Sequence, residues 1–158
     1  CVGCIKGFRP LPSNDTVMKL QFGNRYLYIP RYMKPSTINE GIDDIEAFFA
    51  NPKKKVPGIW SYAYTATCKQ NMAFLEYVDF GSESAKTYLK KNAKKIALRL
   101  IANCEEEAAV RFIKTGIVSN IALKELLKKV EENDMPILKS YILQCLNDGE
   151  SSKQNFYI

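Results

Sequence analysis

Apolar residues recur at helical spacing through most of the second half of the chain, from Ser82 to Asn147. In residues 82–103 the spacing i, i+4, i+8, i+11 and i+15 places one set on a single helix face. That set consists of Ala85, Leu89, Ala93, Ile96 and Leu100. Residues 105–116, 120–133 and 135–148 repeat the pattern. The sequence therefore predicts four short helices in 82–147, arranged as two helical hairpins, and a mainly α fold.

Start and stop signals separate these segments. Ser82 and Asp134 predict N-caps for the first and fourth helices, because their side-chain oxygens can accept an unpaired backbone N–H. Pro136 then falls in an opening turn, where a missing N–H costs nothing. Gly116 supplies the left-handed residue that ends the second helix.

One short motif occurs twice, as IALRLI from Ile96 and as IALKELL from Ile121, each followed by a second short helix. A helix pair of this size cannot bury its own apolar face, so stacking of one pair on the next is expected, as in solenoid arrays. The alternative is a compact helical bundle in which the similarity arises by chance.

The segments YLKKNAKKIALRLI, FIKTGIVSNIALKELLKKVEEN and YILQCLND resemble the ankyrin-like helical segments of bacterial proteins that also carry leucine-rich repeats. The earlier NRYLYIPRYMKPS is similar to a stretch that precedes such segments, so the resemblance spans Asn24 to Asp148. The TPLHxA signature of ankyrin repeats proper is absent. The resemblance implies stacked helix hairpins and a non-enzymatic interaction or scaffold role, and it transfers no catalytic residue.

In the N-terminal half, the apolar residues have a different spacing. Within residues 16–29, Met18, Leu20 and Phe22 alternate with polar residues, a Gly-Asn pair follows at 23–24, and residues 26–29 are apolar, which predicts a β-hairpin on a tight turn. A basic-aromatic linker follows at 31–35. Thr37 and Glu40 then form a capping-box signature for a helix that ends near Ala50.

Residues 36–80 are rich in aromatic side chains, and we expect helices there. Residues 59–80 predict a helix pair or a broken helix, with a break near Gln70 and Asn71. Aromatic residues at this spacing usually form core, but exposed tyrosines would mark a binding surface. Between the helices, the loop NPKKKVPG carries three consecutive lysines, which indicate either a solvated loop or a phosphate-contacting or nuclear-localisation patch.

Composition limits the function classes. The 158 residues, 46% of them hydrophobic, suit a single domain with its own core, preceded by a flexible segment at 1–15 and followed by a polar tail at 149–158. The chain contains no histidine, the commonest general acid–base group and metal ligand, and it contains no GxGxxG, P-loop or GxSxG motif. We therefore expect no enzyme activity, no cofactor and no metal site.

Five cysteines leave one unpaired in any set of disulfides. Three of them, Cys68, Cys104 and Cys145, lie in apolar helical contexts that predict buried, reduced thiols and a cytoplasmic location. Cys1 and Cys4 form a lone CxxC that indicates half a zinc site, a redox pair or a cysteine pair without a role. A first residue of cysteine fits an excised fragment of a longer protein. It also fits a processed lipoprotein, which would be lipid-anchored or secreted.

These observations favour a non-enzymatic protein–protein interaction or scaffold module, with no membrane span, whose partner is another protein or another region of the same longer chain. A net charge of +6 and a pI near 9.0 keep a basic nucleic-acid-binding or anionic-surface-binding module as the alternative. The candidate binding residues are Trp60, Tyr62, Tyr64, Arg31, Tyr32, Lys53, Lys54 and Lys55.

Overall fold

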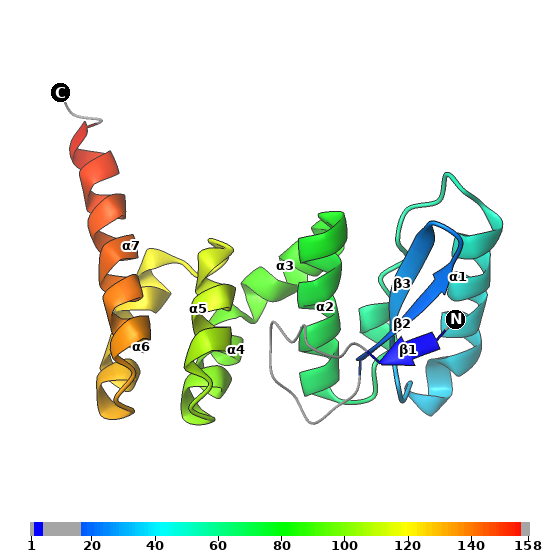
Figure 1. The fold of residues 1–158 in the computed structure, drawn as a ribbon, viewed down its shortest axis with the longest axis horizontal. Helices are drawn as coiled ribbons and strands as arrows, with labels where there is room; N and C mark the ends of the chain where they lie inside the picture. The colour runs from blue at the N-terminus through cyan, green and yellow to red at the C-terminus, as the bar shows by residue number, and fades with distance from the viewer. Residues whose placement is uncertain (1, 5–16, 156–158) are drawn as a thin grey trace. The chain divides into compact units, whose positions relative to one another are not determined.

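The computed structural model describes the backbone of residues 2–4 and 17–155 and the side chains of 17–148. It is mainly helical with a small N-terminal antiparallel sheet, which confirms the expected fold class (Figure 1). The chain divides into two compact units, which meet in sequence between Leu89 and Lys90 and are described separately here. The elements are β1 (Val2–Cys4), β2 (Val17–Phe22), β3 (Arg25–Pro30), η1 (Pro35–Thr37), α1 (Ile38–Ala50), η2 (Ile59–Tyr62), α2 (Ala66–Phe80), α3 (Glu83–Lys91), α4 (Ala93–Ala102), α5 (Glu106–Lys114), α6 (Asn120–Glu132) and α7 (Pro136–Asn155).

The predicted hairpin is confirmed as β2 and β3, whose antiparallel register pairs Val17 with Pro30 and Phe22 with Arg25. The turn lies at Gly23, whose φ of 60° suits a residue without a Cβ. The N-terminal prediction was incomplete, because Val2–Cys4 pairs with β2 as a third strand. Three residues are too few to show a strand period. The rest of the segment expected to be flexible, residues 1 and 5–15, lies outside the described residues.

Helix α2 forms the centre of the first unit. Its residues from Gln70 to Glu76 are all buried, and Cys68, Met72 and Leu75 join Leu27, Phe48 and Ile59 in one hydrophobic cluster. The predicted break near Gln70 and Asn71 was wrong, since α2 runs unbroken through both. The interruption comes earlier, where Ala63 is extended and the Thr65 side chain accepts a hydrogen bond from the Cys68 N–H (3.2 Å). The polar side chains of Gln70 and Asn71 interrupt the apolar sequence pattern, although both residues lie within the buried helix.

Helix α1 ends at Ala50, as predicted. Its capping box does not form, because the Thr37 hydroxyl donates to the Lys34 carbonyl (3.1 Å) instead of accepting from the helix. Gly41 is buried in the first turns, and a Cβ there would lie 2.8 Å from the Met33 sulfur. The glycine therefore allows Met33 to lie against α1.

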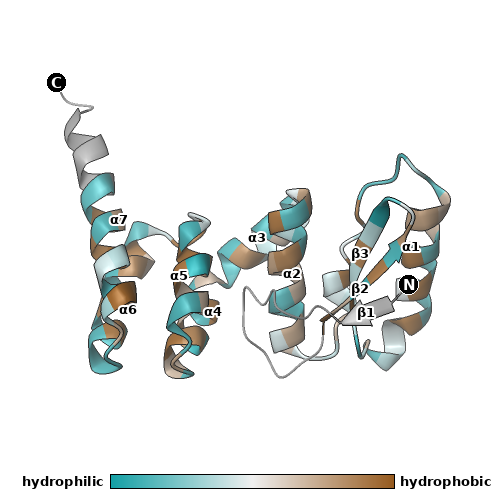
Figure 2. Cartoon of the chain, in the orientation of Figure 1, coloured by the Kyte–Doolittle hydropathy of each residue, from teal (hydrophilic) through white to brown (hydrophobic). Residues whose placement is uncertain are grey.

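The second unit contains two pairs of neighbouring helices. Within it α4 contacts α5 and α6, and α7 contacts α5 and α6 (Figure 1). The inward positions are fully buried aliphatic and aromatic side chains, and the outward faces are mostly hydrophilic, with Ile121, Ile137 and Leu143 as exposed apolar exceptions (Figure 2). Those buried positions include Ile96, Leu100, Phe112, Leu126, Val130, Leu138 and Ile142. Gly116 follows α5 with a φ of 76°, which confirms the predicted stop.

Three helix boundaries differ from expectation, and a fourth, the start of α3, is confirmed. Residues 82–103 form two helices, α3 and α4, because Asn92 departs from helical geometry (φ −110°, ψ 10°). Ser82 does cap α3, since its hydroxyl accepts from the Ala85 N–H (3.3 Å). Asp134 does not cap α7; it lies in the left-handed region (φ 51°), and the Met135 carbonyl accepts the first helical bond. At the other end α7 continues to Asn155, so most of the expected tail is helical.

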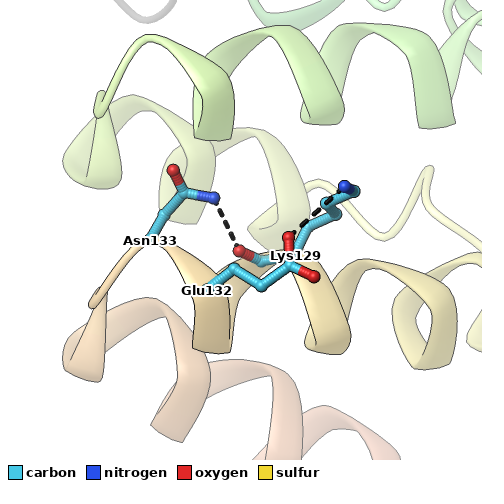
Figure 3. A network of polar contacts seen from close by, with 3 residues as sticks. All are labelled: Lys129, Glu132 and Asn133. Atoms are coloured by element: carbon cyan, nitrogen blue, oxygen red, sulfur yellow. Dashed lines mark hydrogen bonds and ion pairs between the residues drawn. The ribbon is translucent and has the colours of Figure 1, made fainter.

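Polar side chains on the surface form contacts at the ends of helices, and the end of α6 is an example (Figure 3). The Lys129 ammonium lies 3.3 Å from a Glu132 carboxylate oxygen, one turn further along the helix. The Asn133 side-chain amide donates to the Lys129 carbonyl (2.7 Å). An otherwise unpaired carbonyl of the last turn is thereby satisfied.

Two of the three thiol predictions need correction. Cys68 is buried, Cys145 is half-buried, and Cys104 is exposed, and none of the three forms a disulfide. Cys104 lies beyond the end of α4 with a φ of 58°, in a turn that faces solvent rather than on an apolar stripe. Neither side chain of the Cys1–Cys4 pair is described. None of the helices in the described residues is both long enough and apolar enough to span a bilayer.

Candidate functional site

Two extended segments meet in the first unit and bring two tyrosines together. Met33 and Ala63 form an isolated antiparallel β-bridge. The Tyr64 N–H donates to the Tyr32 carbonyl and the Lys34 N–H donates to the Tyr62 carbonyl, both at 3.0 Å. In this register Tyr32 lies directly opposite Tyr64, and residues opposite one another in an antiparallel pair project from the same face.

Both side chains face solvent. Tyr32 is 63% exposed and Tyr64 is 62% exposed. The Arg31 guanidinium lies 5.3 Å from the centroid of the Tyr32 ring, within the range of a cation–π contact. We call the group of Arg31, Tyr32, Lys34 and Tyr64 the tyrosine surface.

The residues between the tyrosines anchor this surface to the core. Ala63 is fully buried, and Met33 lies against Gly41 of α1. The Tyr62 hydroxyl donates to an Asp44 carboxylate oxygen of α1 (2.5 Å). This hydrogen bond, together with burial and the nearby negative charge, raises the pKa of Tyr62 to about 12. Tyr62 therefore supports the surface and does not form part of it.

Trp60 also belongs to the supporting structure. Its ring stacks on Tyr88 of α3, with ring centroids 4.7 Å apart and an interplanar angle of 30°. The Lys69 ammonium lies over both rings, 5.6 Å from Trp60 and 5.2 Å from Tyr88. Burial and the positive charge of Lys34 lower the pKa of Lys69. Lys69 thus adds a cation next to the tyrosine surface.

The three lysines of the predicted patch lie elsewhere. Lys53, Lys54 and Lys55 follow the C-terminal end of α1, in a loop where the Lys54 carbonyl accepts from the Arg25 guanidinium (2.7 Å). The tyrosine surface is anchored at Gly41 and Asp44, in the first half of the same helix. At 1.5 Å per residue, Asp44 and the C-cap Asn51 are about 10 Å apart along the axis. The eight candidate residues therefore form two groups.

The tyrosine surface combines aromatic area with positive charge that no neighbour neutralises. Among the described residues, Arg31, Lys34 and Lys69 take part in no ion pair. Sequence reasoning identified Arg31, Tyr32 and Tyr64 but not Lys34 or Lys69. Lys34 lies in the basic-aromatic linker and could have been included, whereas Lys69 lies within a buried helix and gives no signal. The arrangement suits the binding of an anionic partner.

A buried carboxyl lies beneath the supporting aromatic residues. Glu76 of α2 is only 6% exposed, and its burial raises the pKa of the carboxyl, while polar groups of Ser82, Trp60 and Gly58 oppose part of the rise. Among the side chains at 17–148, no three His, Cys, Asp or Glu residues gather into a group that could hold a metal ion. Glu76 is thus a single buried acid within the packing of the first unit.

Comparisons with known proteins found no family model, no curated protein and no solved structure that matches this chain.

Proposed function

We propose that the protein is a non-enzymatic protein–protein interaction or scaffold module and that the tyrosine surface is its binding site. The observation that carries the proposal is the pair of tyrosines, each more than 60% exposed, beside unpaired cations. Tyrosine and arginine are among the residue types most enriched at binding hot spots, because they combine a large contact area with hydrogen-bonding ends. The partner is another protein, or another region of the same longer chain, with acidic residues at the contact.

The second unit supports a scaffold role. Its helix pairs, α4 with α5 and α6 with α7, contact one another in the order expected of stacked hairpins, in keeping with the ankyrin-like resemblance. Stacked hairpins present extended surfaces without any catalytic group. The absence of a disulfide at Cys68, Cys104 and Cys145 fits a reducing compartment, so the proposal places the module in the cytoplasm.

Nucleic acid or an anionic lipid surface is the second candidate partner, and the same surface favours it. Exposed aromatic rings beside cations can stack on unpaired bases and contact phosphates. A nucleic-acid groove would follow the backbone with a longer basic track, and the lysines at 53–55 lie at the other end of α1. The protein partner is therefore the better-supported candidate.

The test replaces both rings in the double variant Tyr32→Ala/Tyr64→Ala. Affinity capture from the source cell should recover a protein partner with the wild type and lose it with the double variant. The matched control is Phe22→Ala, which removes an exposed aromatic side chain (58% exposed) from the hairpin instead. Circular dichroism should show that both variants remain folded.

A parallel measurement distinguishes the second candidate. Binding to single-stranded oligonucleotides is measured at about 150 mM salt, where screening has weakened the non-specific attraction. The protein-interaction proposal expects weak, sequence-independent binding under these conditions. Tight binding that the double variant abolishes, with unchanged protein capture, would assign the surface to nucleic acid.

A further inference from the structure

A pocket in the first unit lies at the other end of α1 from the tyrosine surface. Its volume is about 610 Å³. Its wall is formed by the start of β3, the loop after α1 and the junction between α2 and α3. Small-molecule sites typically have volumes of this order.

The pocket has an excess of positive charge. Arg25, Lys54 and Lys55 are its basic lining residues, and Glu83 is the single acidic one. Among the described residues none of the three cations is in an ion pair. An anion in the pocket would therefore meet charges that are not already neutralised.

Arg25 fixes the lysine loop beside the pocket. Its guanidinium donates to three backbone carbonyls, those of Phe48, Asn51 (2.8 Å) and Lys54 (2.7 Å). Asn51 also accepts the Lys53 N–H on its side-chain oxygen (3.0 Å). The loop backbone that carries Lys54 and Lys55 is thus held to β3 and α1, so the two lysines are attached to an ordered wall.

Aromatic rings form the apolar side of the pocket. The rings of Tyr26 and Phe80 both line it, with centroids 5.0 Å apart. The Tyr26 hydroxyl donates to Asp79 (2.9 Å), which fixes the plane of that ring. Both side chains are half-buried, so part of each remains accessible to a ligand. A planar group could pack against this wall.

Neutral hydrogen-bonding groups complete the lining. The hydroxyls of Ser82 and Ser84 lie 3.2 Å apart, and both residues line the pocket. Gly81 precedes them with a φ of 63°, and a Cβ there would meet nothing within 4 Å, so the space beside the serines is open. The Ser84 hydroxyl and the lysine ammonium groups together supply the several donors that the oxygens of a phosphate require.

We propose that this pocket binds an aromatic monophosphate, a small anion in which a phosphate group is attached to a ring-bearing skeleton. The phosphate is bound by Lys54, Lys55 and the Ser84 hydroxyl, and the ring packs on Tyr26 and Phe80. A doubly charged phosphate matches two unpaired lysines better than a single carboxylate does. The proposal is independent of the tyrosine surface, which shares none of these residues.

The experiment titrates the full chain with three probes and follows the backbone amide signals of residues 80–84 by NMR. Phenyl phosphate has both the charge and the ring, inorganic phosphate has only the charge, and phenol has only the ring. We expect phenyl phosphate to bind at least about tenfold more tightly than either of the others, since one further interaction of about 1.4 kcal/mol gives that factor. Adenosine monophosphate and phosphotyrosine then tell whether the natural ring belongs to a nucleotide or to a modified side chain.

A matched pair of variants tests the location. Lys54→Gln/Lys55→Gln should weaken phenyl phosphate binding about tenfold or more, whereas Lys53→Gln, in the same loop but outside the lining, should leave it within about twofold. Equal loss in both variants would show a general charge effect and overturn the proposal. Equal affinity for inorganic phosphate and phenyl phosphate, or no shift at residues 80–84, would overturn it as well. None of these variants should alter protein capture by the tyrosine surface.

Discussion

The two units of this chain are stabilised in different ways. In the first unit, polar bonds join residues far apart in sequence: Tyr26 and Tyr28 both donate to Asp79, Tyr62 donates to Asp44, and Arg25 donates to three carbonyls of residues 48–54. In the second unit, buried aliphatic side chains recur along each helix, the ion pairs lie on the surface, and one partly buried polar bond joins distant residues, from the Leu138 N–H to a Glu106 carboxylate oxygen (3.2 Å).

The structure of the second unit is largely specified by residues close together in sequence, whereas that of the first unit depends on contacts between residues far apart in sequence. A repeated aliphatic stripe specifies each helix and its buried face within a few turns of sequence. The Tyr28 hydroxyl donates to Asp79, a carboxylate more than fifty residues away in the sequence. A contact of this kind cannot be recognised from the local sequence, because it forms only when the chain has folded. The second unit should therefore tolerate loss of a polar contact and be sensitive to loss of volume, and the first unit should be sensitive to both.

The largest expected effect is loss of core volume in the second unit. Phe112 of α5 is fully buried, so Phe112→Ala removes an aromatic ring and leaves a cavity. We expect a loss of about 3–5 kcal/mol in the free energy of unfolding, measured by urea denaturation. Ile121→Ala, at a side chain that is 75% exposed, is the control and should change the free energy by less than about 0.5 kcal/mol. A small effect at Phe112 would contradict the assignment of this unit's stability to its buried stripe.

Loss of a polar contact in the first unit comes next. Asp79→Ala leaves the hydroxyls of Tyr26 and Tyr28 without their shared acceptor, and Tyr28 is only 8% exposed. Hydrogen bonds to charged groups typically contribute about 1.5–3 kcal/mol, and we expect a loss of that order by urea denaturation. Asp43→Ala removes an exposed carboxylate of α1 and should change stability by less than about 0.5 kcal/mol. If both variants behaved alike, the tyrosine–aspartate contacts would not stabilise the first unit.

The same difference explains how much could be read from the sequence. The helices of the second unit were predicted by periodicity, yet the break at Asn92 was missed, because Ala93 and Ile96 continue the stripe begun by Ala85 and Leu89 across one non-helical residue. A single changed backbone conformation does not disturb an apolar pattern.

The candidate site, by contrast, depends on contacts between residues far apart in the sequence. The aromatic-rich segments near Tyr32 and Tyr64 were recognised separately, but nothing local indicated that they pair through Met33 and Ala63. The lysines at 53–55 were included among the same candidate residues because the sequence does not show how far they lie from the tyrosines in the fold. Assembly of the tyrosine surface depends on Gly41 and Asp44, whose roles are visible only in the folded chain.

A pH-dependent effect tests one long-range contact of the first unit. The pKa of Tyr62 is raised from 10.0 to about 12, first by its hydrogen bond to Asp44 and then by burial. Because the folded-state pKa lies above the unfolded one, this stabilisation is fully present below pH 10 and is lost as the pH rises through about 12.

Ultraviolet titration of tyrosinate formation measures this effect. In the wild type one tyrosine should ionise near pH 12, and the signal should be absent in Tyr62→Phe. Asp44→Asn keeps an acceptor but removes the charge, and it should move the titration toward 10.0. A step near pH 10 instead of pH 12 missing from the Tyr62→Phe curve, or an Asp44→Asn curve identical to that of the wild type, would show that the Tyr62–Asp44 contact does not persist in solution.

The smallest expected effect concerns the ion pair between Lys94 of α4 and Glu125 of α6, in the second unit. Both side chains are about half exposed (53% and 51%), and exposed pairs contribute only about 0–1 kcal/mol because water screens the charges. Glu125→Gln should therefore lower the free energy of unfolding by less than about 1 kcal/mol, and about 1 M salt should remove the difference. Its neighbour Leu126 is fully buried, and Leu126→Ala should lose about 2–5 kcal/mol at any salt concentration. A salt-insensitive loss at Glu125 as large as that at Leu126 would mean that polar contacts stabilise the second unit as they do the first, and the contrast between the units would fail.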